Sequence, residues 1–170
     1  MKSKTIVTIL ILFGFFIAGC EDDTETPAID TISTYNPLIE NEFPEAKQEV
    51  METFGAIAQS IIDGDMDKLI SFHAYSPKFT EFKNGEQRND GEANEAYERS
   101  VFGSVTEVVK FDAKDLQIAV YGEVANLTFH SDFELKFGEN LVMVNDQITL
   151  LFVNTEDGWK MVHEHHSPLQ

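Results

Sequence analysis

The spacing of apolar residues changes once along this chain, near Val105, and that change limits the fold more than any other feature. Before it, apolar side chains recur at steps of three and four residues, as on one face of a helix: Val50, Met51, Phe54, Ile57, Ala58, Ile61 and Ile62. After it, apolar and polar residues alternate, as in half-buried strands. Helices followed by strands predict an α+β fold.

Local signals divide the two halves into elements. The first helix begins near Pro44, because proline is tolerated in a first helical turn, and ends at Gly64. Asp65 can cap a short second helix, and a third helix covers residues 91–102. Turn sequences at residues 122–123, 138–140 and 156–158 then predict a meander of four long strands, the last three at residues 124–137, 141–153 and 159–166.

The N-terminal residues carry the features of a targeting signal. Lys2 and Lys4 precede an apolar run at residues 6–17, which is shorter than the roughly 20 residues that a membrane-spanning helix needs. The run ends in Ala18-Gly19-Cys20 and resembles a bacterial lipoprotein signal. The resemblance implies cleavage after residue 19 and acylation of Cys20. A plain spanning anchor is the alternative, which the short run disfavours.

The charge of the chain limits its partners. The net charge is −18, and removal of residues 1–19 takes away two lysines and no acid, which gives −20. A surface this acidic excludes nucleic acid and repels anionic lipids. The expected membrane link is therefore through acyl chains on Cys20, at the bacterial cell envelope, on the periplasmic or surface face of the outer membrane. Residues 20–43 are expected to form an acidic tether, and residues 44–170 a single domain without disulfides.

The domain resembles a known family. Its ending, residues 157–167 (DGWKMVHEHHS), and its order of three helices before a long meander resemble the SnoaL-like branch of the nuclear transport factor 2-like, or ketosteroid isomerase-like, superfamily. Residues 65–70 and 121–125 and Thr149 also match. The resemblance implies a cone, in which three N-terminal helices pack on a curved antiparallel sheet around an apolar pocket, and often a homodimer. Members include isomerases, dehydratases, hydrolases and binding domains, so the activity depends on the site.

The last strand carries the first candidate site residues. Alternation places His163 and His165 on one face and Glu164 and His166 on the other. In the related association domain of calcium/calmodulin-dependent kinases, the position matching His166 holds a pocket-facing basic residue, which makes His166 a pocket candidate; a solvent-facing histidine is the alternative. His130, His163 and His165 could together hold zinc or copper, but hydrogen bonds across the sheet or a subunit interface explain them better, and no metal is expected.

Two further groups are pocket candidates. His73 and Tyr75 follow the second helix, and they could supply a proton acceptor and donor near neutral pH. The competing interpretation leaves both as satisfied polar residues and assigns Phe79 and Phe82 to the core. Asp132 is the nearest carboxylate for a general base, although it shares a strand face with His130 and both side chains can equally point outward.

Two functions remain open, and the sequence does not decide whether the protein is an enzyme. The favoured one is a binding module that captures a small, mainly apolar molecule in the pocket, with its orientation fixed by His73, Tyr75, His130 and His166. The alternative is an isomerase, dehydratase or hydrolase without a cofactor, in which the pocket histidines, tyrosine and aspartate transfer protons. This alternative requires that His73, Tyr75, Asp132 and His166 converge on one cavity, and it is to be dropped if they do not. A dimeric structural domain with a closed pocket is a third possibility. No phosphate-binding glycine loop or dinucleotide fingerprint occurs in the mature chain, so no cofactor is expected.

Overall fold

The computed structural model describes residues 35–86 and 88–170. The chain divides into two units at residue 34, and the fold described below is that of the second, residues 35–170. The predicted signal peptide, Cys20 and most of the tether lie outside the described residues. The predicted α+β class is confirmed: four helices accompany a curved, open sheet of six strands in this part of the chain.

The helices begin and end where local capping chemistry predicts. Helix α1 (Pro37–Glu40) is one short turn, and α2 (Pro44–Asp63) starts with proline and ends at Gly64, whose φ of +69° glycine adopts without strain. The Asp65 side chain accepts a hydrogen bond from the Lys68 N–H and opens α3 (Met66–Ser71). Helix α4 (Gly91–Phe102) matches the predicted third helix.

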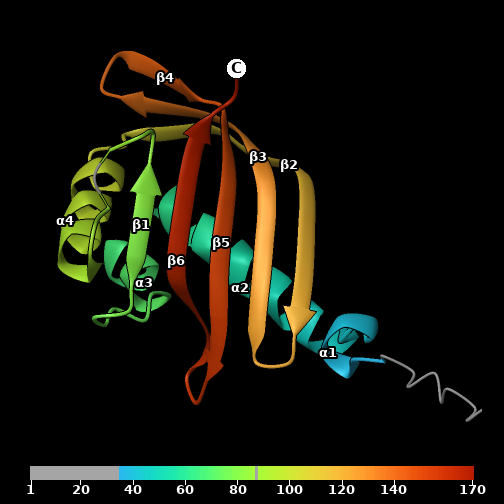
Figure 1. The fold of residues 1–170 in the computed structure, drawn as a ribbon. Helices are drawn as coiled ribbons and strands as arrows, with labels where there is room; N and C mark the ends of the chain where they lie inside the picture. The colour runs from blue at the N-terminus through green and yellow to red at the C-terminus, as the bar shows by residue number, and fades with distance from the viewer. Residues whose placement is uncertain (1–34, 87) are drawn as a thin grey trace, which may run out of the picture. The chain divides into compact units, whose positions relative to one another are not determined.

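The sheet has the order β1-β6-β5-β3-β2. Strands β2 (Glu107–Tyr121), β3 (Val124–Phe137), β5 (Asp146–Thr155) and β6 (Gly158–Pro168) run antiparallel, whereas the short β1 (Thr80–Lys83) pairs with β6 in parallel. Bulges interrupt the β2–β3 and β5–β6 ladders, and bulges increase local bending and twist. Helix α2 crosses one face of this sheet, with α3 and α4 on the side of β1 (Figure 1).

The prediction of one strand over residues 141–153 is wrong. Strand β4 (Asn140–Val144) pairs with the C-terminal half of β3, whereas β5 starts at Asp146 and pairs with the N-terminal half of β3. At the break, the Ser131 hydroxyl donates to the Val144 carbonyl (3.0 Å) and accepts from the Asp146 N–H (2.8 Å). A side chain thereby satisfies backbone groups that would otherwise lack partners, and β4 turns away to border a cavity.

The core lies between α2 and the inner face of the sheet. Phe54 and Ile61 of α2 meet strand residues such as Leu127 and Phe152, which are completely buried. Trp159 is buried there as well, and its indole N–H donates to Glu49 at 3.0 Å. Among the described residues, no helix has the length and apolar character needed to cross a membrane.

Candidate functional site

The inner face of the sheet does not close completely on the helices. A cavity of about 540 Å³ remains, which is the size of a small-molecule site. Most of its wall is apolar and rich in phenylalanine: Phe54, Phe102, Phe111, Phe129, Phe133 and Phe137. Polar residues line it in three places. One is formed by β6 and the segment after α3, the second by α4 and β1, and the third by the start of β5. The cavity therefore joins a large apolar surface to a few polar groups.

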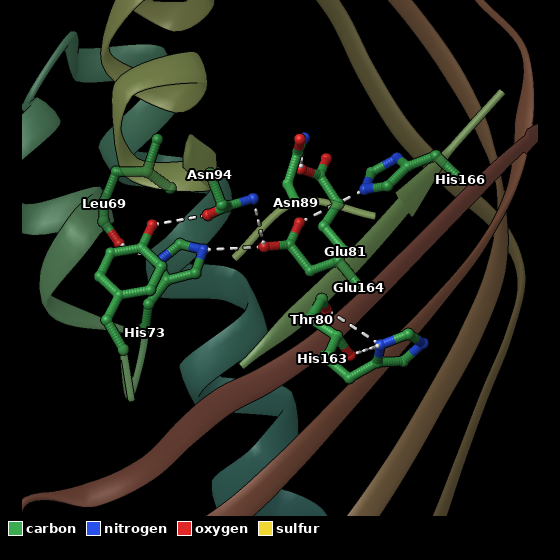
Figure 2. A network of polar contacts seen from close by, with 10 residues as sticks. Leu69, His73, Thr80, Glu81, Asn89, Asn94, His163, Glu164 and His166 are labelled. Carbon is green, nitrogen blue, oxygen red and sulfur yellow. Dashed lines mark hydrogen bonds and ion pairs between the residues drawn. The ribbon is translucent and has the colours of Figure 1, made fainter. Parts of the chain in front are cut away.

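Glu164 is the centre of the polar end of the cavity. Glu164 and His166 share one face of β6, and this face points inward, while His163 points the other way and forms a hydrogen bond with Thr80 (Figure 2). His73 Nε2 lies 3.0 Å from Glu164 Oε1, and His166 Nε2 lies 3.3 Å from Oε2. One carboxyl group that is 4% exposed thus joins two histidines that line the cavity.

The hydrogen bonds around His73 favour an ion pair. Its Nδ1 faces the Leu69 carbonyl oxygen at 3.2 Å and its Nε2 faces Glu164, so both ring nitrogens must donate when Glu164 is ionised. Burial alone raises the pKa of Glu164, but hydrogen bonds from His166 and His73, together with the charge that each ring carries when protonated, outweigh burial and hold that pKa below its usual range. If His73 is an imidazolium and Glu164 a carboxylate, the two ring N–H groups of His73 donate to the Leu69 carbonyl and to Glu164, and both contacts are hydrogen bonds.

A second layer holds this pair in place. Asn94 of α4 is completely buried; its amide donates to Glu164 Oε1 (3.3 Å) and its oxygen accepts from the Tyr75 hydroxyl (2.6 Å). The Tyr75 ring stacks on His73, with 5.0 Å between ring centroids. Burial, and then the nearby Glu98 and Glu164, raise the pKa of Tyr75, so its hydroxyl remains a donor. Tyr75 therefore orients the network from behind the cavity wall.

Glu98 is the second important acid. It lies on the cavity side of α4, one turn after Asn94, and is 6% exposed. Burial and the neighbouring Glu164 raise the pKa of Glu98 well above its usual value, and the opposing effect of Lys83 is smaller. Among the described residues, none forms a hydrogen bond with its carboxyl group. Glu98 is thus an acid at the border of the cavity whose protonated form is favoured by its surroundings.

A third acid, Glu81, supports the site from β1. It pairs with Glu164 across the parallel β1–β6 ladder and is completely buried. Its Oε2 accepts from Asn89 (2.7 Å), whereas Oε1 is the one fully buried side-chain polar atom without a partner in the described part of the chain. Three carboxyl groups therefore crowd one region, and the charges of Glu164 and Glu81 add to the effect of burial in raising the pKa of Glu98.

The structure brings together some of the predicted site residues and separates others. His73, Tyr75 and His166 belong to one network. His130 and Asp132 lie on the outer face: His130 pairs with Asp115 at 3.1 Å, and Asp132 accepts from Lys110 (2.6 Å) and Lys114. The Lys110 and Lys114 ammonium groups lower the pKa of Asp132. The required convergence of Asp132 with the other three residues therefore fails, because even-numbered residues of β3 face away from the cavity, and the enzyme hypothesis built on those four residues is dropped.

The outer-face histidines do not form a recognisable metal site. Within residues 35–86 and 88–170, no three or more His, Cys, Asp or Glu side chains are arranged to hold a metal ion. His163 Nδ1 instead lies 2.7 Å from the Thr80 hydroxyl, and the exposed Phe82 packs edge-on against His163 and His165. The assignment of Phe82 to the core is wrong, because Phe79 and Phe82 have opposite parity and only Phe79 points inward.

Sequence reasoning missed Glu98, Asn94 and Glu81. The signal for the first two was present: Asn94, Glu98 and Val101 recur at steps of four and three on one face of the predicted helix at residues 91–102. Polar residues in an apolar stripe indicate either a solvent-exposed helix face or a functional site. The several acidic residues of this helix are typical of an exposed face, so the pattern did not point to a site. Glu81 is buried between the half-buried Thr80 and the exposed Phe82, but the expectation that Phe79 and Phe82 both belong to the core concealed this pattern.

These features define an α+β domain of the nuclear transport factor 2-like type, with a mainly apolar cavity that has polar groups at one end. The family model described as a SnoaL-like domain matches residues 50–170, so the chain belongs to the SnoaL-like family. A search of curated proteins found no significant match.

Solved structures agree on the fold. A protein of the NTF2-like family from Streptomyces avermitilis, provisionally described as a dehydratase, superposes with a TM-score of 0.67 at 20% identity, over 75% of this chain and 98% of that one. A protein from Novosphingobium aromaticivorans, provisionally described as an aromatic ring hydroxylase, gives a TM-score of 0.63 at 15% identity, over 75% and 91% of the two chains. An NTF2-like protein of unknown function from Pseudomonas putida gives 0.61 at 19% identity, over 75% and 89%.

Proposed function

We propose that this domain binds a small, mainly apolar molecule in its cavity and transfers a proton to or from it without a cofactor. One observation carries the proposal: an acid with a raised pKa, Glu98, and an imidazole hydrogen-bonded to a carboxylate, His166, line the same mainly apolar cavity. Strongly perturbed acids in a cavity are characteristic of catalytic sites. In this proposal Glu98 and Glu164 provide the carboxyl groups that Asp132 was expected to supply.

His166 has the arrangement of a general base. When Glu164 is ionised, it accepts the N–H of His166 Nε2, which leaves the Nδ1 lone pair of the neutral ring free to take a proton. The ion pair with His73 keeps Glu164 ionised, and Asn94 fixes the orientation of the same carboxylate. His73, Asn94 and Tyr75 are then positioning residues.

Glu98 supplies the complementary acid. Because burial raises its pKa and favours the protonated form, the carboxyl group can donate to an oxygen of the ligand, and the same group can accept a proton later. An acid and a base in one apolar cavity suit isomerisation, dehydration or enolisation, in which one group removes a proton while the other stabilises developing charge.

The test measures proton transfer directly. A soluble form spanning residues 21–170 is incubated in D2O with 2-tetralone, an apolar ketone whose hydrogens beside the carbonyl exchange slowly, and deuterium incorporation is followed by NMR. We expect exchange faster than in buffer, and a loss of about 100-fold or more in His166→Gln and in Glu98→Gln. The matched control is His130→Gln, on the outer face. Equal exchange with and without the protein, or unchanged exchange in both cavity variants, would contradict the catalytic role.

Binding alone is the second candidate, favoured by the large apolar share of the cavity wall. It predicts that 2-tetralone perturbs the NMR signals of cavity residues such as Phe129 and Phe133 without any exchange of its hydrogens. The same sample therefore separates a binding module from an enzyme.

We also propose that the mature protein is anchored at the bacterial cell envelope by acyl chains on Cys20, on the periplasmic or surface face of the outer membrane. The sequence of residues 17–20 supports this, together with the apolar run before it. The family resemblance further supports a homodimer formed through the outer sheet face. Light scattering on residues 21–170 tests the dimer, and a monomer at 100 μM would contradict it.

A further inference from the structure

Asp146 is a buried acid that the proposed proton transfer does not use. It is the first residue of β5, and its side chain lies on the inner face with those of Ile148 and Leu150, which also line the cavity. The residue is 6% exposed. The Ser131 hydroxyl accepts a hydrogen bond from the backbone N–H of Asp146 and donates to its backbone carbonyl at 3.4 Å. These contacts fix the backbone of Asp146 and do not involve its carboxyl group.

The Asp146 carboxyl group has no protein partner. Within the described residues it takes part in no hydrogen bond and no ion pair, although other acids of the domain find such partners. Its oxygens are also absent from the fully buried, unpartnered atoms of this part of the chain, so they retain contact with the cavity space. A carboxylate that is buried in an apolar wall without a partner is costly, and a ligand of opposite charge offsets that cost.

The other charged groups of the cavity are already committed. Glu164 pairs with His73 and is hydrogen-bonded to His166, and burial favours the protonated form of Glu98. The Lys83 ammonium donates to the Tyr97 hydroxyl and lies 4.0 Å from the centroid of that ring. Asp146 remains as the one uncommitted charge among the acids that line the cavity in the described part of the chain.

We propose that the ligand of this cavity is an apolar molecule that carries a cationic amine, and that Asp146 binds the amine. The inference rests on the proposed function, because it names the ligand class of the same cavity. Phe129 and Phe133 flank Ser131 on the inner face of β3 and line the cavity, so aromatic faces are available beside the carboxylate. Ammonium groups bind favourably to such faces. The amine lies at the start of β5, and the rest of the ligand extends toward Glu98 and His166.

Three probes of one shape test the charge preference: 2-(2-naphthyl)ethylamine, which is cationic at pH 7, the neutral 2-(2-naphthyl)ethanol and the anionic 3-(2-naphthyl)propanoate. Their dissociation constants for residues 21–170 are measured by titration calorimetry. We expect the amine to bind about 10- to 100-fold more tightly than the alcohol, as for a charge-assisted hydrogen bond, and the anion to bind most weakly.

Asp146→Asn should remove the preference of the cavity for the amine while leaving alcohol binding within about twofold, which also shows that the variant is folded. Asp132→Asn, the same change on the outer face, should leave all three constants unchanged. Equal binding of amine and alcohol, tighter binding of the anion, an amine preference that survives in Asp146→Asn, or no binding of any probe would each overturn the proposal. None of the probes is a ketone, and calorimetry measures their binding without any proton exchange, so this result is independent of the 2-tetralone experiment.

Discussion

At the scale of single residues, Glu164 links the chemistry of the cavity to the stability of the fold. Its carboxylate is the shared partner of His73, His166 and Asn94, all of which are buried or half-buried. Removing one member of a buried ion pair leaves the other charge without compensation, and this usually costs more than the pair contributes. The same residue therefore fixes the ring of the proposed base and the packing of β6 against α3 and α4.

Glu164→Gln tests this role through its pH dependence. At pH 7 we expect the variant to lose about 3 kcal/mol of unfolding free energy, because His73 keeps a buried charge without a counterion. The pKa of Glu164 is lowered in the folded state, so its contribution is complete above the ordinary glutamate pKa of about 4.3 and is lost as the pH falls below it. Urea unfolding at pH 7, 5, 4 and 3 should show the wild type and the variant converging in acid. A constant difference at all four pH values, or an equal loss in the exposed control Glu123→Gln, would contradict the ion pair.

Glu98→Gln should have the opposite sign. The pKa of Glu98 is raised in the folded state, so above pH 4.3 the unfolded chain releases a proton that the folded chain retains, and this lowers stability as the pH rises toward the folded-state pKa. Glutamine removes that penalty. We expect a gain of roughly 1 kcal/mol at pH 7 and no gain at pH 4. Thermal unfolding of both proteins at the two pH values checks the prediction, and a loss of stability at pH 7 would show that Glu98 is ionised in the fold.

At the scale of helices and strands, two glycines show how tertiary contacts override local propensity. Alanine is favoured over glycine by about 1 kcal/mol in the interior of a helix, a preference that applies in full to Gly55 inside α2 and less to Gly91, the first residue of α4. A methyl group on Gly55 meets nothing within 4 Å, whereas one on Gly91 comes within 3.0 Å of Tyr75 Cβ and Cδ1. Helix α4 approaches the site this closely only because Gly91 has no side chain.

We therefore expect Gly55→Ala to stabilise the domain by about 0.5–1 kcal/mol and Gly91→Ala to destabilise it by about 1–3 kcal/mol. The second change should also move Tyr75 away from Asn94, to which it donates at 2.6 Å. Chemical denaturation of the two variants gives the comparison, and proton exchange of 2-tetralone reports on the site. Stabilisation by both alanines would mean that α4 can shift without cost.

The elements also show which features a sequence can predict. Helix ends depend on neighbouring residues, such as Asp65 and Gly64, and these were predictable. The break between β4 and β5 was not, because it depends on Ser131, a residue of another strand that replaces ladder hydrogen bonds with its hydroxyl. The alternation of residues correctly placed His163 and His166 on opposite faces of β6. It did not decide which face of β3 points inward, because both faces of that strand carry polar residues.

At the scale of the whole domain, the site depends on contacts between distant parts of the sequence. The parallel pairing of β1 with β6 sets Glu81 beside Glu164, and the docking of α4 adds Asn94 and Glu98. No local pattern encodes that register, so the fold class and the existence of a pocket were predictable, but the acids that crowd it were not. The raised pKa of Glu98 is a consequence of this assembly, because burial and the charge of Glu164 act on it only in the folded domain.

The acidity of the whole chain makes its proposed attachment to the membrane testable. With a net charge of −18 in the precursor, the protein has no electrostatic attraction to anionic lipids, so retention at the envelope should depend on acyl chains alone. We expect a wash with 1 M NaCl to leave the wild type in the membrane fraction, and Cys20→Ala to abolish acyl labelling and to move most of the protein into the soluble fraction or prevent its processing. Quantitative immunoblotting of the fractions, with metabolic labelling by an alkyne-bearing fatty acid, measures both effects. Membrane retention of Cys20→Ala without any labelling would show that the residues before Cys20 remain as a spanning anchor, because a single chain this acidic has no other means of staying bound.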